Sequence, residues 1–191
     1  MFNPDAFFPV LDKIARILDE NGIRYQLTGG LVSIYYSEPR LTQDADIVVD
    51  PVQLQLRLSS FLDAIRRHRY VANDDVIREA VSNGRMFQLI DSEEGLKIDL
   101  YPRELVAGAI DRSMTIDLTA DLKFPIASRP DLVASKILWI SKGSHKSRRD
   151  VKMLMRGASA EEAALAREFV EGLDLTDLLD EVLAEPDEID A

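Results

Sequence analysis

The sequence contains no cysteine, only two histidines and no apolar run long enough to cross a membrane. The lack of cysteine excludes disulfides, thiolate metal sites and cysteine nucleophiles. A membrane-spanning helix needs about 18 or more apolar residues in a row, and the N-terminal residues lack the basic region and cleavage site of a signal peptide. We therefore expect a cytoplasmic protein with no membrane segment.

Basic residues are outnumbered by acidic ones. The sequence has 23 Lys and Arg and 34 Asp and Glu, which gives a net charge of −11. Such a charge argues against indiscriminate binding to nucleic acid. The bases are unevenly distributed, however. Seven Lys or Arg and a single acid lie between Lys136 and Arg156. The sequence thus predicts one basic segment in an otherwise acidic protein.

The length of 191 residues and the 46% hydrophobic composition fit one globular domain, or one domain with a helical extension. Strand and helix patterns alternate in residues 1–127, whereas residues 128–191 show helical patterns alone. We expect an α/β (α+β) nucleus over 1–127, with a small mixed sheet flanked by helices. A C-terminal helical region would follow over 128–191.

The individual elements are predicted from periodicity and capping residues. In the first half we expect a helix capped by Asn3 with Pro4 in its first turn and ending at Asn21, further helices over 31–36 and 53–68, and strands over 25–28, 45–49, 115–118 and 123–126. The segments 86–90 and 96–101 flank the polar turn DSEEG and predict a hairpin. In the second half we expect helices over 128–141, 146–156 and 176–184, and one that starts at a capping box of Ser159 and Glu162.

Two aspartates, Asp44 and Asp46, stand at the start of an apolar strand. Side chains at positions i and i+2 of a strand point to the same face, so two like charges lie side by side. Such a pair is tolerated when a divalent cation sits between the carboxylates or one stays protonated. Asp99, within a second apolar strand, could supply a third oxygen ligand, and an all-oxygen set suits Mg²⁺ or Mn²⁺. Alternatively, the pair is an ordinary surface feature.

The pair Gly29-Gly30 lies where a strand ends and a helix begins. Backbone N–H groups at such a junction, together with the helix dipole, can receive phosphate oxygens, and a β-carbon would keep the phosphate away. A double glycine can equally be a tight turn. Ser33 could add a hydroxyl contact to phosphate or be a plain first-turn residue. Arg40 and Thr42 could position phosphate or brace the loop before Asp44.

This set of residues resembles the DNA polymerase β-type nucleotidyltransferases, whose signature is two small residues, a spacer, an Asp-x-Asp strand and a third aspartate on a later strand. Here the signature reads Gly29-Gly30, thirteen intervening residues, Asp44-Ala45-Asp46, and Asp99 within LKIDLY. The string RLTQDAD and the segment RPDLVASKILWISKGSHKSRRDVKML are similar to the abortive-infection and toxin-type (AbiEii-like) subgroup. The match covers residues 5 to about 156. The second glycine stands where many relatives have serine.

The resemblance implies a polymerase β-like fold that binds Mg²⁺ and a nucleoside triphosphate such as ATP. It also implies that Asp44 and Asp46 ligate the metals, and that Asp99 ligates the catalytic metal and takes the acceptor's proton. At the matching position Lys136 would clamp phosphate, although a lysine on an apolar helical face can also simply extend to water. Arg148 belongs to a basic helical face that would bind triphosphate or polynucleotide. Asp150 would orient Lys136 or an acceptor hydroxyl, or else pair with Lys146.

Three functions remain open. The preferred one is an Mg²⁺-dependent nucleotidyltransferase that modifies RNA, such as the acceptor end of tRNA, and serves as a toxin with a cognate antitoxin. The second is nucleotidylation of a small aminoglycoside-like molecule, which an acidic surface would suit, or of a protein. The third is a non-catalytic nucleotide-binding or antitoxin-type module. Retention of all three aspartates counts against the third, because without metal they are an electrostatic cost.

Overall fold

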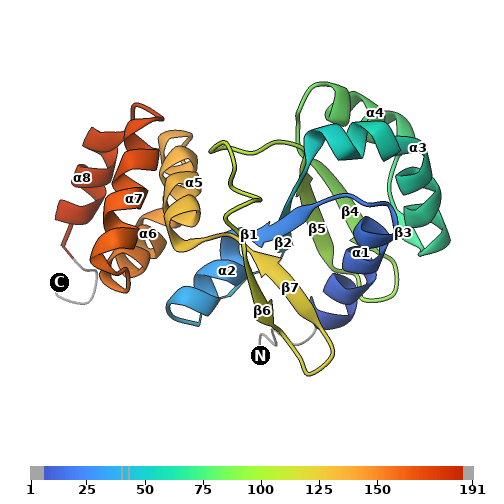
Figure 1. Cartoon of the computed structure of the whole chain (residues 1–191), viewed down its shortest axis with the longest axis horizontal. Coiled ribbons are helices and arrows are strands. Elements are labelled where there is room, and N and C mark those ends of the chain that lie inside the picture. Colours follow the sequence, from blue (N-terminus) through green and yellow to red (C-terminus); the bar gives the residue numbers. More distant parts are fainter. Residues whose placement is uncertain (1–6, 40, 43, 187–191) are drawn as a thin grey trace. The chain divides into compact units, whose positions relative to one another are not determined.

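The computed structural model describes residues 7–39, 41–42 and 44–186, and a mixed sheet organises the N-terminal part of the chain (Figure 1). The described strands are β1 (Tyr25–Thr28), β2 (Asp44–Val49), β3 (Tyr70–Val71), β4 (Phe87–Asp91), β5 (Lys97–Tyr101), β6 (Met114–Asp117) and β7 (Lys123–Ile126). The helices are α1 (Phe8–Glu20), α2 (Gly29–Tyr36), α3 (Pro51–Arg67), α4 (Asp74–Ser82), α5 (Arg129–Ser141), α6 (Ser147–Arg156), α7 (Ala160–Glu171) and α8 (Thr176–Ala184). The predicted α/β architecture with a C-terminal group of helices is confirmed.

The chain divides into two compact units. The first consists of residues 1–32 and 40–127 and contains the whole sheet. The second consists of residues 33–39 and 128–191 and contains the helices α5 to α8. Residues 33–39 thus belong with the C-terminal helices, although they lie early in the sequence.

The sheet has seven strands in the order β3-β4-β5-β2-β1-β7-β6. The central strand β2 runs parallel to β5 and antiparallel to β1, and β1 runs parallel to β7. The predicted hairpin is present as the antiparallel pair β4 and β5. A parallel neighbour for β2 brings the residues of two distant segments into one register.

The core of the first unit lies on one face of the sheet, where α1, α3 and α4 gather (Figure 1). Apolar residues of β2 alternate with its aspartates, and Ala45, Ile47 and Val49 are completely buried. In β5, Ile98 and Leu100 are also fully buried. The opposite face of β2 and β5 therefore carries the polar side chains at the alternate positions.

Local capping explains where the helix α3 begins. Asp50 caps α3, because its Oδ1 accepts the backbone N–H groups of Val52 and Gln53 at 3.0 Å. Pro51 therefore opens this helix, two residues before the predicted start, which suits a residue without an N–H.

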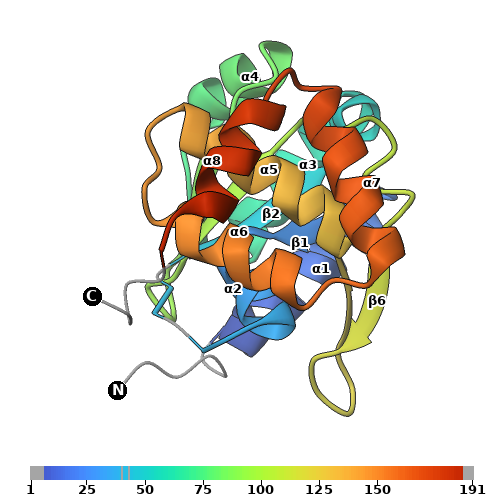
Figure 2. The same cartoon turned by 90° about the vertical axis from the view of Figure 1, so that its left-hand side faces the viewer.

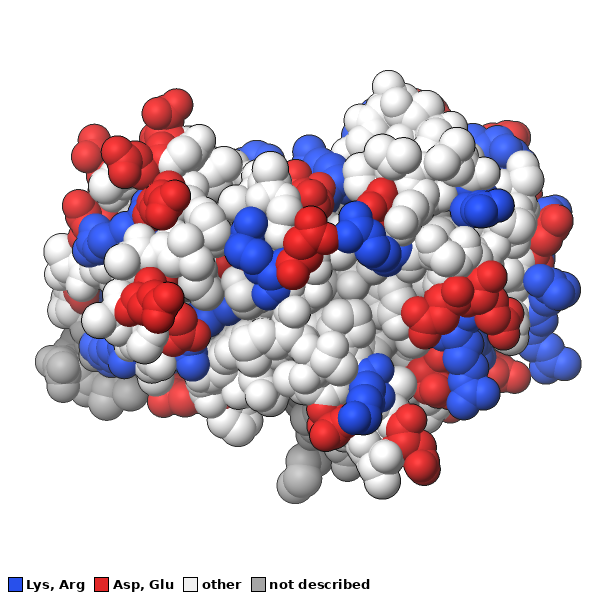
Figure 3. Space-filling view, viewed as in Figure 1, with Lys and Arg blue, Asp and Glu red and all other residues white. Residues whose placement is uncertain are grey.

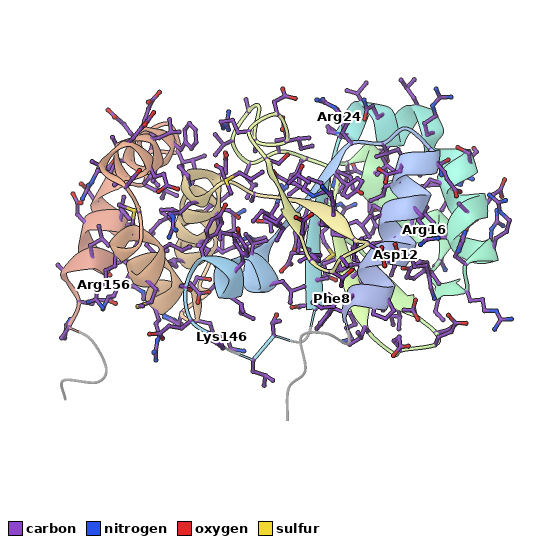
Figure 4. All side chains as sticks on the ribbon, turned by 60° about the horizontal axis from the view of Figure 1, so that its bottom comes forward. Phe8, Asp12, Arg16, Arg24, Lys146 and Arg156 are labelled. Atoms are coloured by element: carbon purple, nitrogen blue, oxygen red, sulfur yellow. The ribbon has the colours of Figure 1, made fainter. Side chains whose placement is uncertain are left out.

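The predicted cap and first proline of α1 lie outside the described residues. Within this helix, Asp12 and Arg16 form an i,i+4 ion pair (Figure 4).

Two elements had no counterpart in the sequence-based expectations, the short strand β3 and the helix α4. Asn73 caps α4, and its side-chain oxygen accepts the N–H groups of Asp75 and Val76. The segment Asn73-Asp74-Asp75, with apolar residues following at helical spacing, is a helix-start signal that was present in the sequence.

The second unit packs its helices mainly around α5 (Figure 2). Ser128 caps α5, and the predicted capping box of Ser159 and Glu162 is confirmed at the start of α7. The guanidinium of Arg129 lies 4.7 Å from the ring centroid of Tyr36, a cation–π contact that ties the 33–39 segment to this unit. None of the described helices has the length and apolar character that crossing a membrane requires.

Candidate active site

The strand register places Asp46 directly opposite Asp99 on the parallel strands β2 and β5. Asp44 lies two residues before Asp46 and hence on the same face. Three carboxylates from two segments of the chain thus share one face of the sheet. Asp99 is buried, and Asp44 and Asp46 are partly exposed.

The neighbouring strands extend this pairing into a polar row across the sheet. Thr28 on β1 is the register partner of Asp46, and Gln88 on β4 is the register partner of Asp99. The row therefore reads Thr28, Asp46, Asp99 and Gln88. Because Gly29 and Gly30 follow Thr28 directly, the glycine pair stands at one end of the row and Gln88 at the other.

Two of the site carboxylates, Asp46 and Asp99, have raised pKa values. Burial raises the pKa of Asp46 to about 6, and the charges of Asp44 and Asp99 act in the same direction. Burial and the charge of Asp44 also raise the pKa of Asp99. The cost of placing these negative charges together makes the face a candidate cation site.

Two hydrogen-bond donors that the sequence reasoning missed hold these carboxylates. The hydroxyl of Tyr101 donates to Oδ1 of Asp46 at 3.1 Å, and Nε2 of Gln88 donates to Oδ1 of Asp99 at 2.7 Å. Tyr101 lies two residues after Asp99 and so shares its face. That spacing was visible in the sequence, whereas the Gln88 contact requires the register of the β4–β5 hairpin.

The glycine pair contacts Asp46 in this structure. Gly29 has a φ of +66°, and a β-carbon built on it would lie 1.9 Å from Oδ2 of Asp46. The backbone N–H of Gly30 donates a hydrogen bond to the Asp46 carboxylate. The predicted exclusion of a β-carbon at this turn therefore has a cause that the sequence did not reveal, which is the close approach of a side chain from β2.

The remaining predicted residues of this region lie as follows. Thr42 is buried, and its hydroxyl lies 3.4 Å from both the backbone oxygen and Oδ1 of Asp44, so it braces the start of β2. Arg40 lies outside the described residues. The helix α2 begins at Gly29, two residues earlier than expected, and Ser33 is consequently buried in its second turn rather than placed in its first.

Within the second unit, Lys136 and Asp150 form a buried ion pair. Nζ of Lys136 lies 2.6 Å from Oδ2 of Asp150, and the two side chains are 6% and 7% exposed. Of the partners considered for Asp150, the structure places Lys136 beside it. The prediction that Lys136 contacts a triphosphate stays a prediction.

The basic face of α6 is bonded to acidic and carbonyl groups of its own unit. Arg148 pairs with Glu181 at 2.9 Å and also with Glu185, and Arg149 pairs with Glu38 at 2.8 Å. Nζ of Lys152 donates to the backbone oxygens of Glu185 and Pro186 at 2.7 and 3.0 Å. Groups at the end of α8 and at Glu38 therefore engage this face in the structure, and its predicted binding of triphosphate or polynucleotide stays a prediction.

On the face shown in Figure 3, acidic and basic groups are interspersed over the C-terminal helices. Lys146 and Arg156 mark the two ends of α6 in Figure 4, Lys146 directly before the helix and Arg156 as its last residue. The acids that pair with this helix, remote in the sequence, could not be assigned from helical periodicity alone.

The three aspartates fit a divalent cation in their chemistry. All their donor atoms are hard oxygens on one face, and their mutual repulsion would be relieved by a positive ion. As the side chains lie, no group of three His, Cys, Asp or Glu within the described segments is arranged to hold a metal ion. The contacts of Asp46 with Gly30 and of Asp99 with Gln88 account for where two of these carboxylates are held.

Residues 16–188 match the family model described as nucleotidyl transferase AbiEii toxin, type IV toxin–antitoxin system. The chain belongs to this family. The sequence-based assignment to the toxin-type nucleotidyltransferases is therefore confirmed. Membership of this family identifies the protein as a transferase enzyme. No curated protein sequence is significantly similar to it.

Solved structures share its fold. An antigenic nucleotidyltransferase-like protein from Paracoccidioides brasiliensis is similar with a TM-score of 0.56 and 18% identity, over 95% of this chain and 94% of that one. The antibiotic-resistance factor ANT(2″)-Ia, solved in complex with adenylyl-2″-tobramycin, is similar with a TM-score of 0.56 and 12% identity, over 86% of this chain and 97% of that one. At such identities the comparison shows a nucleotidyltransferase fold.

Proposed function

We propose that this protein transfers a nucleoside monophosphate from a nucleoside triphosphate to an acceptor hydroxyl, with a divalent metal held by Asp44, Asp46 and Asp99. The observation that supports it is the register of β2 and β5, which sets Asp46 opposite Asp99 with Asp44 on the same face. The glycine turn that follows β1 adjoins this face, since Thr28 is the register partner of Asp46.

The three carboxylates divide the work. Asp44 and Asp46 would hold the metal together with the triphosphate. Asp99 would hold it on the acceptor side and take the proton of the hydroxyl that attacks the α-phosphate, and pyrophosphate would leave. Mg²⁺ or Mn²⁺, when bound, supplies Lewis-acid stabilisation of the phosphate oxygens and makes the acceptor hydroxyl easier to deprotonate. Burial, and to a lesser degree the neighbouring carboxylates, raise the pKa values of Asp46 and Asp99, which supports the proposal because a bound cation would offset both effects.

The triphosphate is received at the glycine turn. Gly29 and Gly30 open the helix α2, where backbone N–H groups and the helix dipole favour an anion. In this structure the Gly30 N–H donates to the carboxylate of Asp46, and we propose that this N–H faces the phosphate when the triphosphate is bound. Ser33, Arg40 and Thr42 are assigned to the surroundings of this turn.

We assign Lys136 to bind the negatively charged triphosphate, as the family resemblance implies. Its ammonium is held by Asp150, and this buried pairing fixes the position of a side chain that would otherwise be mobile. Asp150 acts through Lys136 in this proposal and is a positioning residue. Arg148, paired with Glu181 and Glu185, is kept as a weaker candidate for contact with phosphate.

RNA is the first acceptor class we propose. A toxin of a toxin–antitoxin system must modify a component of the cell that makes it, and RNA offers the terminal hydroxyl groups that this chemistry uses. A cognate antitoxin is the partner that the family description implies. The pairing of α6 with Glu181 and Glu185 means that RNA must compete with these carboxylates for Arg148.

A small cationic compound with hydroxyl groups is the second acceptor class. The net charge of −11 favours a positively charged acceptor, and the fold is shared with ANT(2″)-Ia, whose solved complex contains adenylyl-2″-tobramycin. This class predicts transfer that responds weakly to salt. Transfer to RNA predicts a steep loss of affinity as salt rises, because phosphate contacts release counterions.

A single screen tests the proposal. Four α-labelled nucleoside triphosphates are each incubated with the protein, Mg²⁺ and one of three acceptors, which are total RNA, a mixture of cellular proteins and an aminoglycoside. We expect label in RNA with one preferred nucleotide, and no label with Asp44→Ala or Asp46→Ala. Label that persists in either variant contradicts the catalytic assignment, and label in the aminoglycoside alone selects the second acceptor class.

A further inference from the structure

Each of the three site carboxylates has an uncharged hydrogen-bond donor beside it. Thr42 lies beside Asp44, Tyr101 donates to Asp46, and Gln88 donates to Asp99. A neutral donor orients a carboxylate without cancelling the charge that a cation requires. The carboxylate of Asp91, by contrast, is paired with the ammonium of Lys13 at 2.7 Å.

Gln88 is the donor whose role the sequence pattern and the family signature leave unexplained. It is an exposed residue, the second of β4, and its side chain could remain solvated without a partner. Its Nε2 nevertheless lies 2.7 Å from Oδ1 of Asp99, a short distance for an amide donor. The antiparallel register holds the two residues opposite each other, so the contact follows from backbone pairing.

We propose that Gln88 is a positioning residue for the nucleotidyl transfer, which fixes the Asp99 carboxylate through Oδ1 and leaves Oδ2 to serve the metal and the acceptor hydroxyl. This inference rests on the proposed function of Asp99. Gln88 stands at the end of the polar row opposite the glycine turn.

The charge of the donor matters as much as its geometry. An amide donor restricts rotation of the carboxylate and leaves its full negative charge in place. A lysine at the same position would reach the same oxygen and compensate that charge, which weakens the attraction for a cation. Gln88 therefore separates orientation from neutralisation, and substitutions can test the two separately.

The test uses Gln88→Leu, which removes the donor at similar length, and Gln88→Lys, which restores a donor with positive charge. Gln55→Leu is the matched control, because Gln55 is an exposed glutamine on α3 away from the row. The probes are Mn²⁺ binding followed by electron paramagnetic resonance, the kcat and nucleotide KM of transfer, and the ¹H–¹⁵N resonances of the Gln88 side-chain amide.

For Gln88→Leu we expect kcat and Mn²⁺ affinity each to fall about 10-fold, in the range found for residues that orient metal ligands, with the nucleotide KM unchanged. Gln88→Lys should bind Mn²⁺ more weakly than Gln88→Leu. The side-chain amide resonances of Gln88 should differ between the wild type and the Asp99→Ala variant. The Gln55→Leu control should match the wild type in every measurement.

The outcomes separate this inference from the proposed function. An active wild-type protein whose Gln88→Leu variant equals the Gln55→Leu control, or whose Gln88 amide is unaffected by Asp99→Ala, overturns the role of Gln88 alone. A wild-type protein that neither binds Mn²⁺ nor transfers a nucleotide overturns the function of the aspartates, and the role of Gln88 with it.

Discussion

Gly29 and Asp46 approach so closely that a β-carbon on residue 29 would lie 1.9 Å from Oδ2 of Asp46. The glycine turn and the Asp-x-Asp strand are therefore one structural unit. The absence of a side chain at residue 29 makes room for the carboxylate, and the N–H of Gly30 holds it. A signature that reads as two separate motifs in the sequence is a single contact in space.

We expect Gly29→Ala to abolish nucleotidyl transfer while the protein still folds. The new methyl group displaces the Asp46 carboxylate, and the positive φ costs about 1–2 kcal/mol of stability. Transfer rates and the free energy of unfolding in urea measure the two effects. Gly22→Ala is the matched control, because Gly22 has a φ of +63° with open space around it. The Gly22→Ala control should lose similar stability and keep its activity. Equal activity in Gly29→Ala and Gly22→Ala contradicts a functional role for the contact between Gly29 and Asp46.

We expect Asp46→Asn to be inactive yet more stable than the wild type in metal-free buffer at pH 8. Removing one charge relieves the repulsion from Asp44 and Asp99, worth about 0.2–1 kcal/mol between neighbouring strands. Added Mg²⁺ should raise the melting temperature of the wild type, because a ligand that binds only the folded state stabilises it, and should leave the variant unchanged. An equal shift with Mg²⁺ in both proteins contradicts the assignment of Asp46 as a ligand.

We expect Lys136→Met to destabilise the protein by about 3–5 kcal/mol, because it leaves Asp150 charged and buried. The double variant Lys136→Met with Asp150→Leu should recover most of that loss. If Lys136 serves the triphosphate, the double variant stays inactive although it is stably folded. Unfolding in urea and the rate of nucleotidyl transfer are the measurements. A double variant with the wild-type transfer rate refutes the role in nucleotide binding and leaves a purely structural pair.

We expect Asp91 to make the stability depend on pH below about 4. Burial alone would raise its pKa, but the hydrogen bonds from Lys13 and from the N–H groups of Glu94 and Glu93 outweigh burial and lower the pKa. The folded state therefore binds this proton less tightly than the unfolded state. Its contribution is complete above the unfolded pKa of about 3.9 and is lost as the pH falls through the folded value.

Asp91→Asn should accordingly cost about 1–3 kcal/mol at pH 7 and flatten the acid limb of the stability curve. Asp121→Asn, an exposed aspartate in the turn before β7, is the control and should change neither. Urea unfolding between pH 3 and pH 7 measures both. Parallel curves for the wild type and Asp91→Asn are the result that contradicts this account of the turn between β4 and β5.

The elements that could be predicted are those whose signals are local. The apolar run after Asp44, the turn DSEEG and the capping box at Ser159 depend on residues close in sequence, and all lie where expected. The family signature also depends on short strings of residues. These features explain why the fold and the family were accessible without coordinates.

The features that could not be predicted depend on pairing between distant segments. The partner of Asp99 on β4 follows from the hairpin register, and the contact of Asp46 with Tyr101 follows from the parallel pairing of β2 and β5. Likewise, the contacts of Arg148 and Lys152 could not be predicted, because their partners are Glu181, Glu185 and Pro186, which lie far along the chain. Helical periodicity shows which residues share a face of the helix. It does not identify the residues that this face contacts.

The parallel pairing of β2 with β5 also has a consequence during synthesis on the ribosome. Asp46 and its hydrogen-bond partner Tyr101 are 55 positions apart, so β2 leaves the ribosome well before the strand beside it exists. Pairings of such long range form late in folding. A nascent chain that ends before β5 lacks Asp99, so if Asp99 has the proposed catalytic role, nucleotidyl transfer begins only after that strand has emerged.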